Sequence, residues 1–103
     1  MPHRLYVRPA VETMVAYFRS KASADDVQTA VTAACRAMNS AGFPPERIIP
    51  ALKWLLREAV AESGVSASDV RIQRVSEQLI PWMIVACFGD SSARKTPRVL
   101  GSY

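Results

Sequence analysis

The chain has 103 residues, half of them hydrophobic, and carries a formal net charge of +4. This length suits one domain with a single core, and the hydrophobic fraction excludes a wholly disordered chain. The excess charge comes from the two ends, +2 in residues 1–9 and +2 in residues 90–103, so the body between them is neutral and does not indicate a nucleic-acid-binding protein.

The first helix is expected from Pro9 to about Ser20. Proline suits the first turn of a helix, because its missing N–H would have no partner there. The apolar residues that follow recur at helical spacing: Val11, Met14, Val15 and Phe18. The residues before Pro9 lack the continuous apolar stretch of a signal peptide, so we expect no such peptide and a mobile N-terminus.

The second helix is predicted to begin after Ser23. Asp26 follows three residues later, which makes a capping box with Asp in place of Glu. Gly42 is suited to the position just after the helix end. The apolar stripe of this helix is Val27, Ala30, Val31, Ala34 and Met38.

The third helix is predicted to begin at Pro44-Pro45 and to end at Gly64. Pro50 lies early in it, so its first turn is expected to be separate or kinked. The apolar stripe is broad and contains Ile48, Ile49, Leu52, Leu55, Leu56, Ala59 and Val60.

The fourth helix is predicted to begin after a Ser66 cap, with Asp69 three residues on. Its stripe is Ile72, Val75, Leu79, Trp82 and Ala86. Pro81 should kink it, since the proline ring removes one backbone hydrogen bond and crowds the preceding turn. Residues 83–88 are alternatively a short strand, but no second strand is evident to pair with them, so helix is favoured.

These elements predict an all-α domain of four helices over residues 1–89, with short connections that favour antiparallel neighbours. The last helix is expected to be kinked at Pro81. Residues 90–103 are polar, basic and interrupted by proline, so we expect a flexible tail.

The most unusual segment is residues 79–88, ten consecutive non-polar residues. It is too short to cross a bilayer as a helix, which takes about 20 apolar residues. Four of its side chains fall off the helical stripe: Ile80, Ile84, Cys87 and Phe88. If the fourth helix is peripheral, they form a large exposed patch, and burial in a homodimer or against a partner protein would cover it. If Pro81 turns them inward, they belong to the chain's own core.

A second candidate interface lies on the third helix. Trp54 falls opposite the core stripe, with Arg57 and Ala61 beside it. A tryptophan flanked by an arginine and small residues is typical of the centre of a protein interface. The alternative is that another helix of the same chain covers Trp54.

Residues for catalysis or metal binding are scarce. His3 is the sole histidine, no Cys-x-x-Cys pair exists, and the four glycines are isolated. Glu58 and Glu62 share a helix face but have no third ligand. We therefore predict no catalytic residue, no cofactor and no metal. Two cysteines, Cys35 and Cys87, in separate helices are most simply interpreted as reduced, buried thiols of a cytoplasmic protein.

The segment 59–70 resembles the helix-turn-helix of bacterial DNA-binding regulators. Gly64 matches the glycine of the turn, Val65 the buried residue after it, Ser66 the cap of the second helix and Val70 a core position of that helix. The second helix of that family lies in the major groove. The resemblance implies base contacts from Ala67, Ser68 and Arg71, and a phosphate contact from Arg74.

The motif differs from the family's pattern at two core positions, Val60 and Gln73. DNA binding through residues 59–75 is therefore the second hypothesis. The first is a small non-catalytic protein–protein interaction module that self-associates or forms part of a complex. Its candidate interface residues are Trp54, Arg57, Ala61, Ile80, Ile84, Cys87 and Phe88. A small-ligand binder or an enzyme would need a pocket that the sequence does not indicate.

Overall fold

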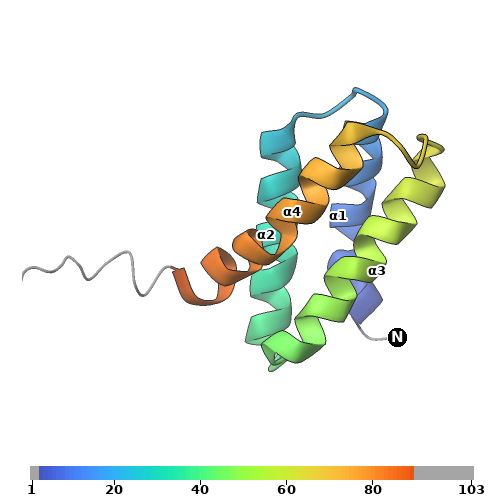
Figure 1. Ribbon diagram of the computed structural model, residues 1–103. Coiled ribbons are helices and arrows are strands. Elements are labelled where there is room, and N and C mark those ends of the chain that lie inside the picture. The colour runs from blue at the N-terminus through green and yellow to red at the C-terminus, as the bar shows by residue number, and fades with distance from the viewer. Residues whose placement is uncertain (1–2, 90–103) are drawn as a thin grey trace, which may run out of the picture.

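The computed structural model describes residues 3–89, which form four α-helices, a terminal π-helical turn and no strand (Figure 1). The helices are α1 (His3–Phe18), α2 (Ala24–Ser40), α3 (Pro45–Ser63) and α4 (Val70–Ile84), followed by η1 (Val85–Gly89). The predicted all-α fold is confirmed, and so is helix rather than strand for residues 83–88. The tail 90–103, predicted to be flexible, lies outside the described residues.

Helix α1 lies between α2 and α3 and packs closely against both, whereas α2 and α3 barely touch each other (Figure 1). Helix α4 crosses α2 and α3 diagonally, and η1 contacts α2. All four helices contribute to one core, whose largest fully buried side chains are Met14, Met38, Ile48, Leu52 and Leu55. None of the helices among the described residues is long and apolar enough to cross a membrane.

Helix α1 begins six residues earlier than predicted, and Pro9 lies inside it. The expectation of a mobile segment before Pro9 is therefore wrong for residues 3–8. Burial explains the difference, because Val7 is fully buried in line with Val11 and Met14. The ring of Tyr6 also meets that of Phe43 edge-on, with 5.5 Å between centroids. These contacts offset the backbone hydrogen bond that Pro9 cannot donate.

Both predicted ends of α2 are confirmed. The Ser23 hydroxyl accepts a hydrogen bond from the Asp26 N–H at 3.1 Å, and the Asp26 carboxylate accepts one from the Ser23 N–H at 3.0 Å. Gly42 follows the helix with φ +94°, a backbone conformation that favours glycine. Together, Val27, Val31, Ala34, Cys35 and Met38 form the buried face of α2.

Helix α3 begins at Pro45 and ends at Ser63, and Gly64 caps it as predicted, in the left-handed region at φ +75°. The helix is continuous through Pro50, so the separate first turn that the sequence suggested does not occur. An exposed proline in the second turn loses only one backbone hydrogen bond, and burial of Ile48, Ala51 and Leu52 around it holds the helix.

Asp69, not Ser66, caps α4. The Asp69 carboxylate accepts a hydrogen bond from the Arg71 N–H at 2.9 Å, while the Ser66 hydroxyl accepts one from the Ser68 N–H at 3.3 Å within the loop. The helix then passes through Pro81 to Ile84, where the geometry changes to the π-helical turn η1. The kink at Pro81 stays a prediction.

Candidate interaction site

The flank of α3 that faces α1 is closed. Trp54 is half-buried there, and the guanidinium carbon of Arg4 lies 4.9 Å from the centre of its ring. Two turns further on, Arg8 donates two hydrogen bonds to the Glu62 carboxylate, at 2.7 and 3.2 Å. Helix α1 therefore covers Trp54, which is the alternative that the sequence left open.

The Arg8–Glu62 pair sets the charge state of this flank. Hydrogen bonds from Arg8 hold the pKa of Glu62 below its usual value, and the Glu62 carboxylate raises the pKa of Arg8. Arg19 donates a further hydrogen bond to the backbone carbonyl of Glu62 at 3.0 Å. Glu62 is thus hydrogen-bonded within the chain through both its carboxylate and its backbone carbonyl.

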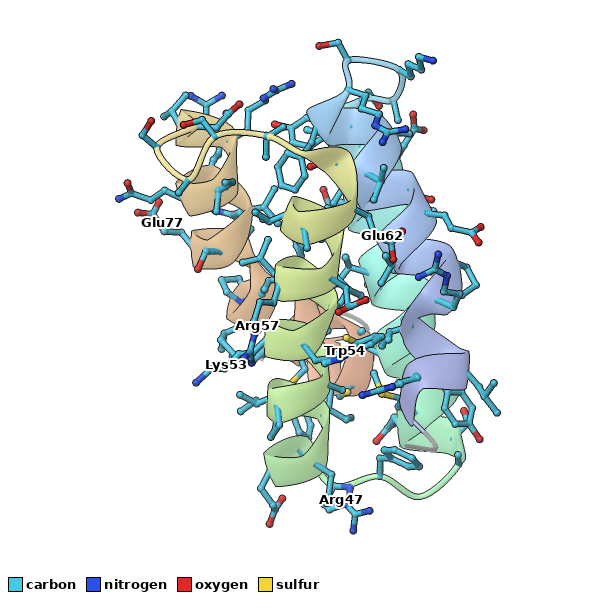
Figure 2. All side chains as sticks on the ribbon, turned by 90° about the vertical axis from the view of Figure 1, so that its right-hand side faces the viewer. Arg47, Lys53, Trp54, Arg57, Glu62 and Glu77 are labelled. Atoms are coloured by element: carbon cyan, nitrogen blue, oxygen red, sulfur yellow. The ribbon has the colours of Figure 1, made fainter. Side chains whose placement is uncertain are left out.

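The opposite flank of α3 faces α4 and is open. Figure 2 shows Lys53 and Arg57 on this side of the helix, whereas Trp54 and Glu62 lie toward α1. The predicted cluster of Trp54 with Arg57 is therefore divided between two flanks. Ala61 is exposed.

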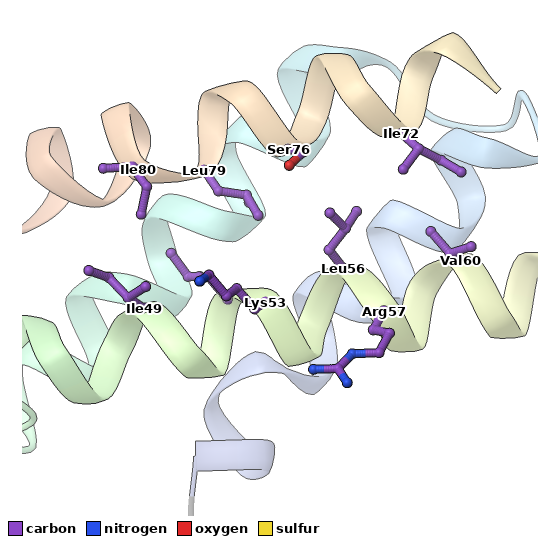
Figure 3. A pocket seen from close by; sticks show the side chains of 10 residues that line it. Ile49, Lys53, Leu56, Arg57, Val60, Ile72, Ser76, Leu79 and Ile80 are labelled. Carbon is purple, nitrogen blue, oxygen red and sulfur yellow. The ribbon is translucent and has the colours of Figure 1, made fainter. Parts of the chain in front are cut away.

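Between α3 and α4 lies a cavity of about 330 Å³, here called the α3/α4 groove (Figure 3). Its lining is aliphatic except for Lys53, Arg57 and Ser76, and no acidic side chain contributes. The lining residues are Ile49, Leu52, Lys53, Leu56, Arg57, Val60, Ile72, Ser76, Leu79 and Ile80.

Sequence reasoning missed this groove, although the signal for it was present. The broad apolar stripe of α3 is in fact two adjacent rows of side chains. Ile48, Leu52, Leu55 and Ala59 are buried in the core. Ile49, Leu56 and Val60 are half-buried and line the groove. A stripe too broad for one neighbouring helix indicates a second surface.

The end of α4 and η1 expose a second apolar surface, here called the C-terminal apolar patch. It comprises Ile80, Ile84, Val85 and Phe88, which are 38, 48, 50 and 50% exposed. The stripe residues of α4 and η1 are buried: Val75, Leu79, Met83 and Ala86. The sequence therefore placed three of the four patch residues correctly off the stripe but missed Val85. Cys87, which the sequence analysis named both as an interface residue and as a buried thiol, is half-buried.

Both cysteines are free thiols. Burial raises the pKa of Cys35 to about 12, and burial also raises the pKa of Cys87. Both thiols are therefore protonated at neutral pH and poor nucleophiles. Within residues 3–89, no three His, Cys, Asp or Glu side chains come together as a metal site would require.

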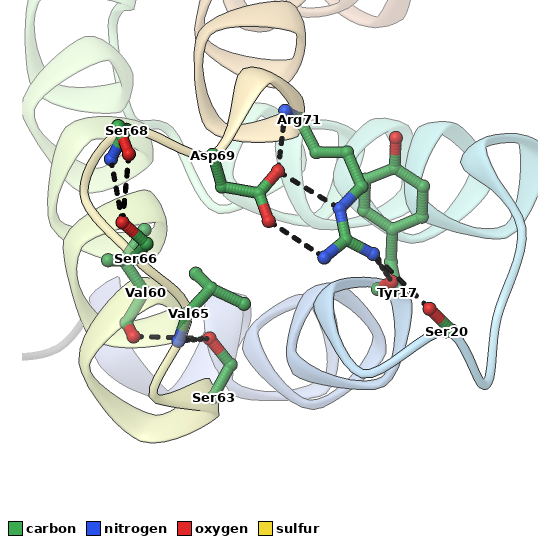
Figure 4. Close-up of polar contacts among 9 residues, drawn as sticks. All are labelled: Tyr17, Ser20, Val60, Ser63, Val65, Ser66, Ser68, Asp69 and Arg71. Carbon is green, nitrogen blue, oxygen red and sulfur yellow. Dashed lines mark hydrogen bonds and ion pairs between the residues drawn. The ribbon is translucent and has the colours of Figure 1, made fainter.

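The residues singled out by the helix-turn-helix resemblance lie around the start of α4. Ala67 and Ser68 are exposed in the loop before the helix, and Arg74 is exposed on its first turns. Arg71 is half-buried and turned toward its own chain (Figure 4).

Arg71 connects α4 to the end of α1. Its guanidinium donates to the Asp69 carboxylate at 2.8 and 3.1 Å, to the Tyr17 carbonyl at 3.2 Å and to the Ser20 hydroxyl at 3.4 Å (Figure 4). Hydrogen bonds from Arg71 lower the pKa of Asp69 to about 2. Arg71 would have to give up these contacts to reach a DNA base.

Comparison of the chain with protein-family models, curated proteins and solved structures finds no match. The case for a function therefore depends on the two surfaces described above.

Proposed function

We propose that this protein is a small, non-catalytic interaction module that self-associates through the C-terminal apolar patch. The observation that carries the proposal is the exposure of four large apolar side chains within nine residues, at the end of α4 and in η1. Single exposed apolar residues are ordinary on protein surfaces, whereas several in one short segment are typical of an interaction site.

The packing of α4 supports this role. Its buried face, formed by Val75, Leu79 and Met83, already rests on the core. The four patch residues lie off this buried face and keep 38 to 50% of their surface exposed. A second copy would bring an identical patch, and a two-fold contact would bury both at once. This arrangement removes apolar surface from water without requiring any other partner.

The experiment is sedimentation velocity on the full chain at micromolar concentration. We expect a dimer for the unaltered protein and a monomer for Ile84→Glu, because a carboxylate in the centre of the contact would have to be buried without a partner. Leu5→Glu is the matched control. Leu5 is 82% exposed on α1, away from the patch, so this variant should remain dimeric.

Circular dichroism must show the same helix content in all three proteins. A clean monomer of the unaltered chain, without aggregation, would overturn self-association. Equal loss of the dimer in the Ile84 and Leu5 variants would also count against the patch, because it would indicate a general effect of added charge.

A further inference from the structure

We infer that the α3/α4 groove is a docking site for an amphipathic helix of a partner protein that carries carboxylates along one edge. The inference goes beyond self-association through the C-terminal apolar patch and does not depend on it. Three observations carry it: the length of the groove, the nature of its two rims and the way in which its walls are held.

The groove has the length that helix recognition requires. It follows α3 from Ile49 to Val60 and α4 from Ile72 to Ile80. At about 1.5 Å per residue these walls are roughly 17 and 12 Å long. A helix that binds in a groove uses apolar anchors at i, i+3 or i+4, and i+7, which span about 10 Å. Three such anchors therefore fit between the two aliphatic walls.

The charges on the rim select the partner. Lys53 and Arg57 are one turn apart on α3, and neither forms an ion pair with any carboxylate in residues 3–89. By contrast, Arg8 and Arg71 are each paired with an acidic residue. Two acidic residues at i and i+4 on an incoming helix would match the spacing of the two cations.

The same charges argue against the chain's own C-terminal segment as the occupant. Residues 90–103 carry Arg94, Lys95 and Arg98 against Asp90, a net charge of +2. Two cations on the rim and no acid in the lining would repel such a segment.

The walls of the groove are held from below and at one end. Leu52 and Leu79 belong to the core and form the floor. At the Ile72 end, the hydrogen bonds from Arg71 to Asp69 and to the Tyr17 carbonyl hold the start of α4 to α1. A groove whose walls are already fixed costs little ordering entropy when a helix binds.

The test uses two fluorescein-labelled synthetic helices with the same leucines at i, i+4 and i+7. One carries glutamates along one edge, and the other carries lysines at the same positions. Fluorescence anisotropy with the full chain should show saturable binding of the glutamate peptide and about tenfold weaker binding of the lysine peptide.

Two variants locate the site. Lys53→Glu with Arg57→Glu should reverse the preference between the peptides, and Ser76→Trp should weaken both by filling the groove. Lys21→Glu is the control, since Lys21 is exposed in the loop between α1 and α2 and should leave the preference unchanged. Thermal melts check that each variant is folded. If Ser76→Trp does not fold, a second groove-filling variant, Ile72→Trp, takes its place.

Equal binding of both peptides, no binding of either, or indifference to the double charge reversal would overturn the inference. Sedimentation of the double charge-reversal variant tests the groove independently of the proposed self-association. The double charge reversal should leave the dimer intact. Loss of the dimer in that variant would show that a second copy occupies the groove and would overturn the partner helix.

Discussion

The two flanks of α3 belong to one helix but differ in how far the rest of the chain covers and pairs their side chains. Toward α1, the half-buried Trp54 lies under Arg4, and Glu62 is paired with Arg8. Toward α4, aliphatic side chains remain half-buried, and Lys53 and Arg57 are in no ion pair among the described residues. The first flank is complete within the chain. The second has both of the features that an interaction surface needs, apolar area and charge that another molecule can match.

This difference shows why residue type alone is a poor guide to an interface. Trp54 is of a residue type typical of interface centres, yet here it packs between α1 and α3. Leu56 and Val60 are of residue types typical of a core, yet they line an open groove. Neighbouring helices, not side-chain chemistry, decide which of these residues another molecule can reach.

The largest expected effect distinguishes two adjacent leucines. Leu55→Ala should lower the free energy of unfolding by about 3 kcal/mol, because Leu55 is fully buried and its loss leaves a cavity. Leu56→Ala should cost about 1 kcal/mol, since the open groove leaves no enclosed void. Urea unfolding measures both. Equal losses would mean that the groove flank is as closed as the α1 flank.

Trp54→Ala should lower the free energy of unfolding by about 2 kcal/mol, roughly half the cost at a fully buried tryptophan. The protein should sediment as the unaltered chain does, because α1 already covers this side chain. Phe88→Ser is the comparison, with little loss of stability and a weaker dimer. If Trp54→Ala abolished association and left stability unchanged, the closed flank would be an interface after all.

A smaller effect compares two arginines. Arg8→Met should lower the melting temperature slightly at low ionic strength, and 1 M NaCl should largely remove the difference from the unaltered protein, since salt screens exposed ion pairs. Arg57→Met should leave the melting temperature unchanged at both salt concentrations, because Arg57 is in no ion pair with a carboxylate of residues 3–89. Calorimetry checks both, and a salt-sensitive loss in Arg57→Met would contradict the contrast.

The smallest effect concerns the end of the groove that Arg71 holds. Since the folded-state pKa of Asp69 is about 2, below its usual value near 4, the Asp69 charge stabilises the fold above about pH 4. That contribution is lost as the pH falls from 4 toward 2. Asn at this position can still cap α4 but carries no charge.

Asp69→Asn should therefore be less stable than the unaltered chain at pH 6, and the difference should shrink as the pH falls toward 2. Urea unfolding at pH 6, 4 and 2.5 measures it. A difference independent of pH would show that the Arg71 contact does not depend on the carboxylate charge.

One four-residue pattern shows what local sequence can and cannot predict. Ser-x-x-Asp occurs at Ser23–Asp26 and again at Ser66–Asp69. At the first site it forms the predicted capping box. At the second, the Asp69 carboxylate pairs with the Arg71 guanidinium, which also reaches α1, and Asp69 itself becomes the cap. The partner on α1 is 54 residues away from Arg71, so the local pattern carries no information about it.

The sequence predicted only part of the two candidate surfaces, because local spacing carries no information about where distant helices pack. The spacing of Ile80, Ile84 and Phe88 placed them off the helical stripe but left open whether they are exposed or turned into the core. The packing of the last helix on the rest of the fold decided that they are exposed. The α3/α4 groove did not follow from spacing, because its existence depends on where α4 crosses α3.

The sequence by itself determined the four helices, the cap at Ser23, the left-handed glycines at positions 42 and 64 and the apolar rows on each helix, since all of these depend on residues within a few positions of one another. Only the tertiary structure decided that α1 extends back past Pro9, that Trp54 is covered and that the second row of α3 is left open. These outcomes depend on burial against helices that are distant in sequence, and the free energy of that burial outweighs local preference at Pro9.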